Sequence, residues 1–313
     1  MTAGPDAVID RVTLIVSDLD LAEDDYVRTF GCRVVQRGDI DPALIRVLCI
    51  RQARGRRSLL RLGRERIELL EFTDSAGRPY PPGSTSTDLW FQHMAIVVTD
   101  MRHAYQRVMA NRRFRPISRD GPVRLPETSG GVMAFKFRDH DGHPLELLAF
   151  PPGHVPGPWR AANGTRPFLG VDHTAIAISH TANSTRFFGS VFGFSAGTRT
   201  ENRGPEQADL DDVEDVHVSV TQLGPDLPAP RMELLRYHVG TRRPIPPGTA
   251  SNDILATHCA LRVASLDATT TALARRGTPV ADDHLMTLRG GIRAALIAGP
   301  DGHRFLVEER AAA

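Results

Sequence analysis

The sequence predicts an α+β protein made of four similar units, each a strand followed by a helix and three further strands. A long internal repeat supports this organisation: PPGSTSTDLWFQHMAIVV at 81–98 recurs as PPGTASNDILATHCALRV at 246–263. Glu68 and Glu233 keep the same spacing of 165 residues, and Asp-Gly-His turns recur at 141–143 and 301–303. A shared order of landmarks over half of the chain indicates a duplication, and each copy is too long for a solenoid repeat.

The repeat divides the chain into two homologous domains, at 1–152 and 169–313, joined by a Pro- and Gly-rich linker at 153–168. The four units lie at about 6–74, 90–151, 169–238 and 255–310. We expect consecutive units to pair in one sheet, because the Pro-Pro-Gly connections, of about 17–20 residues, suffice for a crossover. The alternative is an exchange of units between the halves.

Each unit shows the same order of signals. In the first, alternating apolar positions predict a strand at 8–16, and Ser17 or Asp18 caps a helix that ends at Gly31. Its remaining strands are expected near 32–37, 44–51 and 58–72. The other units begin with strands at 92–98, 171–178 and 257–263, each followed by a helix, to about 111, 192 and 276. Their later strands are expected at 132–138, 144–150, 194–200, 216–223, 231–237, 292–298 and 303–309, and the polar segment 202–212 is expected to be an exposed loop.

Composition narrows the class of protein. The chain has 313 residues, 41% hydrophobic and 24% charged, with a formal net charge of +1, which argues against a nucleic-acid partner. No apolar run approaches the roughly 20 residues of a membrane span, and the N-terminus lacks a signal-peptide core. Three scattered cysteines fit a reducing compartment. We therefore predict a cytoplasmic protein that binds a small molecule; whether it forms a homodimer stays open.

Strand alternation places polar side chains together. His173 shares a strand face with two alanines, His258 lies with Ala260 and Arg262, and Glu233 lies with Tyr237. Two imidazoles and a carboxylate are a suitable donor set for a divalent transition metal. The sequence thus predicts that His173, Glu233 and His258 converge on one concave face.

The four units, with the motifs DHTAIAIS, HMAIVVTDM and DHDGHPLELLAF, resemble the vicinal oxygen chelate superfamily, which includes glyoxalase I, extradiol dioxygenases and bleomycin-resistance proteins. The resemblance implies paired βαβββ modules that form open eight-stranded, cup-shaped half-barrels. It also implies a metal, often held by residues on the first and last strands of the modules. Internal duplication of this kind is typical of two-domain members.

Carried over to this sequence, the resemblance gives the N-terminal domain Arg11, Glu68, His93 and Glu146. Arginine cannot release its proton to bind a metal, so we expect Arg11 to replace the cation and to contact Glu68 or Glu146. A metal-free N-terminal site is the favoured interpretation, although Glu68, His93 and Glu146 remain a three-ligand alternative.

In the C-terminal domain the resemblance gives His173, Glu233 and His258, with Leu306 in place of the fourth ligand. Glu308 lies two residues further, on the same strand face, and is an alternative ligand. We expect this domain to bind Fe(II), Mn(II) or Zn(II).

Three further residues are candidates for the chemistry: His217 as general acid or base, Tyr237 as a hydrogen-bond partner, and Arg262 as an anchor for an anionic oxygen. The function favoured by the sequence is a metal-dependent dioxygenase, lyase or isomerase acting through vicinal oxygens of a small organic substrate, aromatic compounds included. The alternatives are a binding protein that sequesters a small molecule, as drug-resistance relatives do, and a metal-free enzyme.

Overall fold

A computed structural model of the protein describes residues 7–50, 53–160, 166–224, 230–239, 242–281 and 284–309. Residues 161–165 of the predicted linker lie outside these ranges, as do residues 6, 51–52, 225–229, 282–283 and 310 of the predicted units. Among the described helices, none combines the length and apolar character needed to cross a membrane.

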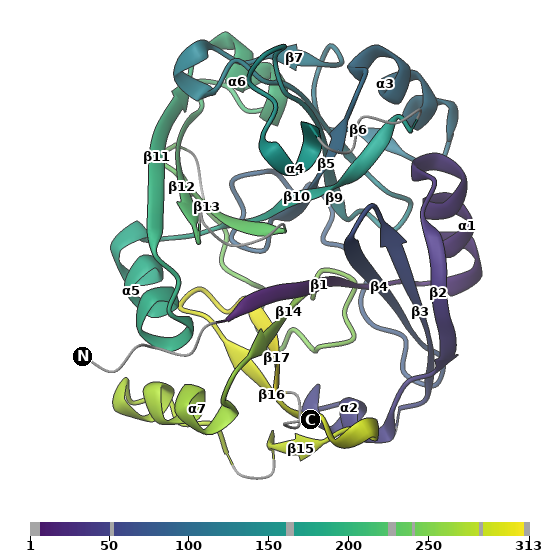
Figure 1. Ribbon diagram of the computed structural model, residues 1–313, viewed down its shortest axis with the longest axis vertical. Helices are drawn as coiled ribbons and strands as arrows, with labels where there is room; N and C mark the ends of the chain where they lie inside the picture. Colours follow the sequence, from purple (N-terminus) through teal and green to yellow (C-terminus); the bar gives the residue numbers. More distant parts are fainter. Residues whose placement is uncertain are drawn as a thin grey trace.

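Two mixed sheets form the framework (Figure 1). The first, which we call the 1–4 sheet, is built by the first and fourth units in the order β15-β16-β17-β14-β1-β4-β3-β2. Its strands are β1 (Val8–Ile15), β2 (Arg33–Asp39), β3 (Gly55–Leu62), β4 (Glu65–Phe72), β14 (His258–Val263), β15 (Met286–Thr287), β16 (Arg293–Ala298) and β17 (Arg304–Glu309).

The second, which we call the 2–3 sheet, is built by the second and third units in the order β11-β12-β13-β10-β5-β9-β8-β6, with β7 beside β8. Its strands are β5 (Gln92–Val98), β6 (Arg115–Pro116), β7 (Val123–Arg124), β8 (Met133–Arg138), β9 (Pro144–Ala149), β10 (Phe168–Ala177), β11 (Ala196–Arg203), β12 (His217–Leu223) and β13 (Arg231–Tyr237). The α+β class with two open many-stranded sheets is therefore confirmed.

The predicted pairing of consecutive units is wrong. Strand β1 pairs antiparallel with β14, and β5 pairs antiparallel with β10, so the units are exchanged between the two halves of the chain. The connection between β4 and β5 is long enough for either arrangement, so its length carries no information about the partner.

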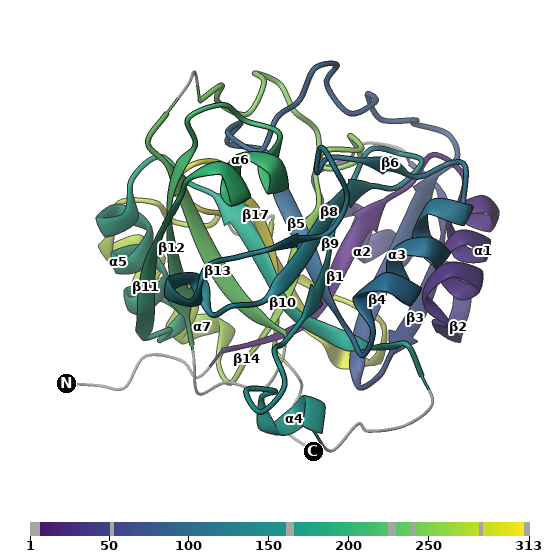
Figure 2. The same cartoon turned by 90° about the horizontal axis from the view of Figure 1, so that it is seen from above.

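Helices whose units belong to different sheets pack in shared hydrophobic cores. Figure 2 shows α1 (Leu19–Phe30) beside α3 (Met101–Ala110) at one end of the molecule, and α5 (Thr181–Phe192) with α7 (Leu266–Arg275) at the other. One hydrophobic core contains side chains of the first and second units, including α1 and α3. A second contains side chains of the third and fourth units, including α5 and α7. The two units of each half of the sequence therefore share one core, although their strands belong to different sheets.

The two Pro-Pro-Gly connections cross and hold one another. Arg78 binds Asp253 at 2.7 and 2.9 Å, and Arg243 binds Asp88 at 2.6 and 2.7 Å. The two pairs are equivalent positions of the repeat, 165 residues apart. Both aspartates are buried, and each also accepts a hydrogen bond from a backbone N–H of its own connection. The repeated stretch thus fixes the exchange of units.

Two short helices correct the sequence prediction. The run at 44–51, expected as a strand, contains α2 (Pro42–Val47), because Asp41 caps it and Pro42 occupies its first turn. The segment 202–212, expected as an exposed loop, contains α6 (Pro205–Asp211), with Gln207, Leu210 and Asp211 buried. The remaining helix, α4 (Gly157–Arg160), lies in the predicted linker.

The crossing can be tested at Gly77. A Cβ at this position would lie 1.7 Å from the backbone oxygen of Asn252, so Gly77→Ala should destabilise the protein by about 1–3 kcal/mol. Gly38→Ala is the control, because a Cβ there meets no atom within 4 Å. Urea unfolding measures both variants, and equal stability of the two would contradict the crossing.

Candidate metal centre

Four side chains of the 2–3 sheet face one cavity of about 720 Å³: His93 on β5, Glu146 on β9, His173 on β10 and Glu233 on β13. We call this the 2–3 cavity and the sheet face that lines it the inner face. The four residues are the first- and last-strand positions of the second and third units. Two come from each half of the chain. Sequence reasoning assigned them to two separate sites, and the exchange of units brings them to one cavity.

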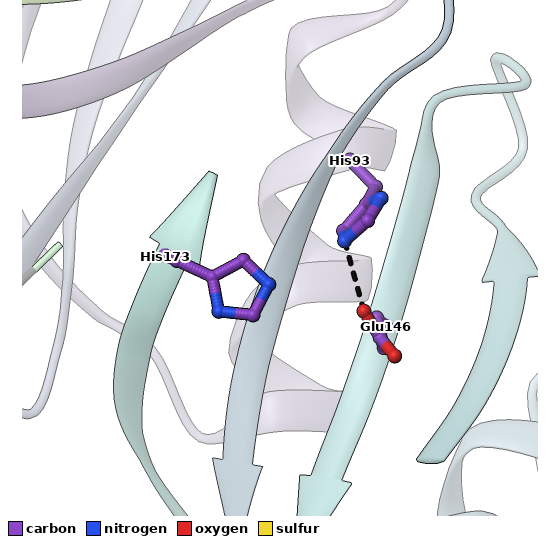
Figure 3. Close-up of side chains that lie close together, drawn as sticks. All are labelled: His93, Glu146 and His173. Carbon is purple, nitrogen blue, oxygen red and sulfur yellow. Dashed lines mark ion pairs between the residues drawn. The ribbon is translucent and has the colours of Figure 1, made fainter. Parts of the chain in front are cut away.

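The ligand atoms of three of these residues lie close together (Figure 3). One atom each of His93, Glu146 and His173 lies within 4.8 Å of the others. The Nε2 atom of His93 lies 2.8 Å from an oxygen of Glu146, and that of His173 lies 3.5 Å from an oxygen of Glu233. The arrangement therefore brings two imidazole nitrogens and the Glu146 carboxylate together, with Glu233 beside His173.

His93 is the side chain that fits a metal ligand most clearly. It is 3% exposed, and neither ring nitrogen makes a hydrogen bond of acceptable geometry. Buried polar atoms are normally paired, and burial lowers the pKa of His93 to about 4, which keeps its imidazole neutral. A neutral imidazole beside a carboxylate suits a divalent transition metal.

A buried carboxylate holds the Nδ1 atom of His173. This atom lies 3.1 Å from Asp172, whose other oxygen accepts hydrogen bonds from the Trp159 indole at 2.8 Å and from Arg231 at 2.7 Å. A carboxylate behind a histidine fixes its orientation and leaves the other nitrogen for a metal. Because Trp159 belongs to α4, the segment between the two halves contributes to this support.

An irregularity in β10 makes this contact possible. Neighbouring residues of a regular strand point to opposite faces, yet Asp172 and His173 both line the 2–3 cavity. The register of β10 against β5 shifts between Val171 and His173. Bulges commonly re-aim side chains beside functional sites, and here the bulge turns the aspartate toward its neighbour.

Their surroundings give Glu146 and Glu233 different pKa values. Although burial alone would raise the pKa of Glu146, the nearby imidazole of His93 lowers it to about 2. Burial raises the pKa of Glu233. Burial opposes the charge on His173, but Glu233 and the hydrogen bond with Asp172 raise its pKa to about 9. A proton on His173 therefore supplies positive charge between the carboxylates.

A second buried network forms another wall of the 2–3 cavity. Lys136 lies 2.6 Å from Asp211 of α6, and the hydroxyl of Tyr237 donates to the same carboxylate at 3.1 Å. Gln207 also donates to Asp211. Tyr237 thus faces the cavity, as the sequence predicted, but its hydroxyl is engaged with Asp211.

The 1–4 sheet has its own cavity of about 430 Å³, and Arg11 is one of its lining residues. Arg11 donates to Glu68 at 2.7 Å, as predicted, and to both oxygens of Glu308 at 2.7 and 2.8 Å. Glu146, the other predicted partner, lies in the 2–3 sheet. Arg57 also lies 2.8 Å from Glu68. Guanidinium groups therefore form ion pairs with Glu68 and Glu308, the carboxylates that the sequence suggested as metal ligands.

His258 does not join His173 and Glu233, because β14 belongs to the 1–4 sheet. Burial and nearby Arg304 lower the pKa of His258 to about 3, and neither ring nitrogen has a hydrogen bond. Leu306, at the position equivalent to Glu146, packs in an apolar cluster with Leu44 and Ile45 of α2. The predicted triad is therefore divided between the two sheets, and α2 packs against Leu306 in the 1–4 sheet.

His217 and Arg262 are also placed differently from the expectation. The inner face of β12 carries Val218 and Val220, so His217 lies on the opposite, outer face, where it contacts Glu201 at 2.9 Å. Arg262 lines the 1–4 cavity and lies 3.3 Å from Asp10.

Sequence reasoning missed the groups behind the ligands, above all Asp172, Trp159 and Lys136. The sequence did contain an indication of the role of Asp172. The pair Asp172–Arg231 repeats as Asp10–Arg66, and both pairs are in contact. A repeated acid–base pair beside a repeated strand residue indicates shared support.

Comparisons with known proteins agree with this architecture. The sequence model of the glyoxalase/bleomycin resistance protein/dioxygenase superfamily matches residues 8–147 and 170–307. Glyoxalase I from Zea mays superposes with a TM-score of 0.65 at 15% identity, covering 97% of this chain and 93% of that one. A proposed dioxygenase from Bacillus subtilis superposes with a TM-score of 0.56 at 15% identity, covering 99% and 86%. No curated protein matches the sequence. At these identities the structures show a shared fold.

The buried ion pair in the wall should be important for stability. Asp211→Asn leaves the Lys136 ammonium buried without its counter-charge, which should cost about 3–5 kcal/mol of unfolding free energy. Asp24→Asn, in the exposed pair with Arg28, should change stability by less than about 1 kcal/mol. Chemical unfolding of both variants provides the measurement; a wild-type midpoint for Asp211→Asn would show that the pair contributes nothing.

The proton on His173 gives a pH dependence to the metal-free protein. Its folded pKa, raised to about 9, exceeds the roughly 6.5 of an unfolded chain. The resulting stabilisation is therefore complete below about pH 6.5 and is lost as pH rises through about 9. His173→Gln should lack this loss, and Asp172→Asn should shift the His173 titration, followed by NMR, to lower pH. Identical stability profiles for His173→Gln and wild type would refute the assignment.

Proposed function

The chain belongs to the glyoxalase/bleomycin resistance protein/dioxygenase superfamily, and from this premise we propose that it is a metal-dependent enzyme acting in the 2–3 cavity. The convergence of His93, Glu146, His173 and Glu233 on one cavity carries this proposal. The site differs from the triad expected from sequence, because His93 and Glu146 take the places assigned to His258 and Leu306.

The two imidazole nitrogens of His93 and His173 and the carboxylate of Glu146 suit Zn(II), Mn(II) or Fe(II). When bound, such a cation would act as a Lewis acid for two neighbouring oxygens of a small organic substrate. Three protein donors leave open positions for both of these oxygens. This donor set fits a lyase, an isomerase or a dioxygenase.

The two glutamates take different roles in this proposal. Glu146 stays ionised beside His93, whereas Glu233 has a raised pKa and its side chain is 19% exposed to the cavity. Environments that push the pKa values of two carboxyls apart separate a fixed charge from a group that exchanges protons. We assign to Glu233 the transfer of a proton at the substrate carbon beside the bound oxygens.

The cavity walls limit the substrate. Hydroxyl and amide groups of Thr198, Thr200 and Asn202 offer hydrogen bonds, while an apolar wall excludes water; it includes Leu125, Val132, Leu210, Val218 and Leu235. The arginine and lysine among the described lining residues, Arg231 and Lys136, already neutralise buried carboxylates. We therefore propose a substrate of low negative charge.

Two other functions remain alternatives: sequestration of a small molecule in the 2–3 cavity, and catalysis without metal. The size of the cavity and its mixed lining suit a bound ligand in either case. Neither alternative accounts for the close grouping of His93, Glu146 and His173.

The test is metal binding. His93→Ala should lose a metal equivalent or weaken its affinity by more than about 100-fold, beyond the 10–100-fold typical of residues behind the ligands. His258→Ala, the equivalent position in the 1–4 sheet, is the matched control and should bind like wild type. Isothermal titration with Zn(II) and Mn(II) measures both. If His93→Ala and wild type bind metal alike, the 2–3 cavity is no metal site, and sequestration or metal-free catalysis takes its place.

A further inference from the structure

The outer face of the 2–3 sheet carries a second histidine–carboxylate cluster, away from the 2–3 cavity. Glu201 on β11 lies opposite Ser219 on β12, and His238, just after β13, lies opposite His217 on β12. The backbone N–H of His238 donates to the carbonyl of His217 at 2.8 Å, which confirms that these two residues are cross-strand neighbours. Side chains directly opposite one another on antiparallel strands are close enough to share a ligand.

The cluster is ordered by its own contacts. The His217 Nε2 atom lies 2.9 Å from Oε2 of Glu201, and the two imidazole rings stack with centroids 4.4 Å apart. The Ser219 hydroxyl lies 2.6 Å from Nε2 of His238 and 2.7 Å from Oε2 of Glu201. One ligand atom of each of Glu201, His217 and His238 lies within 4.8 Å of the others. Little side-chain rearrangement is needed to bring the three around one ion.

The surrounding charges decide which ions suit the cluster. Arg199 holds Oε1 of Glu201 at 2.6 Å and leaves Oε2 facing the imidazoles. Arg236, opposite Ser219, and Arg203, opposite His217, add positive charge on the same sheet face. These arginines oppose any cation held by charge alone. Mg²⁺ and Ca²⁺, which depend on oxygen ligands, are therefore poor candidates, whereas ions that bond strongly to imidazole remain suitable.

We propose that Glu201, His217 and His238 form a surface site for a divalent transition metal of the zinc, nickel and copper group. The site is separate from the 2–3 cavity and does not depend on the function proposed for it. Its occupant would tie the edge strand β11 to β12 and β13. Alternate residues of these strands, including Val218, Val220 and Tyr237, line the 2–3 cavity on the other side, so the site would stiffen one wall of that cavity.

The experiment counts zinc ions per chain by equilibrium titration of chelator-treated full-length protein with Zn²⁺ alone. The surface variant is His217→Gln/His238→Gln, and the cavity variant is His93→Gln/His173→Gln. His180→Gln, at an exposed histidine that precedes α5, is the matched control. The surface variant should bind one zinc fewer than wild type, and the cavity variant should keep that zinc. The control should match wild type.

The outcomes separate this site from the 2–3 cavity. If the cavity holds no metal, wild type binds one zinc and the surface variant none, and the surface site stands. Equal zinc content in the surface variant and wild type overturns it, as does a cavity variant that binds none. Addition of Cu²⁺ to the cavity variant gives a second readout: its spectrum should report nitrogen ligands, and Glu201→Gln should weaken binding. A copper spectrum without nitrogen ligands would also overturn the site.

Discussion

The reciprocal ion pairs Arg78–Asp253 and Arg243–Asp88 hold the two Pro-Pro-Gly connections across one another. Each aspartate is buried and also ties the backbone of its own connection, so removing one carboxylate would free both an arginine and a turn. Because these connections lead from one unit to the next, their crossing determines which strands become neighbours. The composition of both cavities follows from this constraint.

Exchange of the units produces two unlike sites from one duplicated sequence. The 2–3 sheet collects two histidines and two glutamates from equivalent positions. The 1–4 sheet collects Arg11, Glu68, His258 and Leu306 at the same four positions. In that sheet a guanidinium supplies the positive charge between carboxylates, and an apolar helix, α2, fills the remaining space. One sheet thus carries the donor set, while the other carries an arginine and a leucine at two of the equivalent positions.

The support behind the first-strand residue is the same in both sheets. Asp172 with Arg231, and Asp10 with Arg66, occupy the same positions behind His173 and Arg11. Both β10 and β1 carry a register shift at the aspartate. The same scaffold therefore orients an imidazole in one sheet and a guanidinium in the other, which shows that the local geometry is independent of the group presented.

The sequence by itself determined the duplication, the four βαβββ units, the first- and last-strand positions of the site residues, and the contact of Arg11 with Glu68. These follow from spacing, alternation and local charge, which are properties of short segments. It did not determine that His93 and Glu146 join His173 and Glu233 while His258 lies elsewhere. It also predicted a strand where α2 forms, and it offered His217 for the chemistry of the site although this residue lies on the outer face. Those outcomes depend on which units share a sheet and on what covers each face, and only the packing of distant segments decides them.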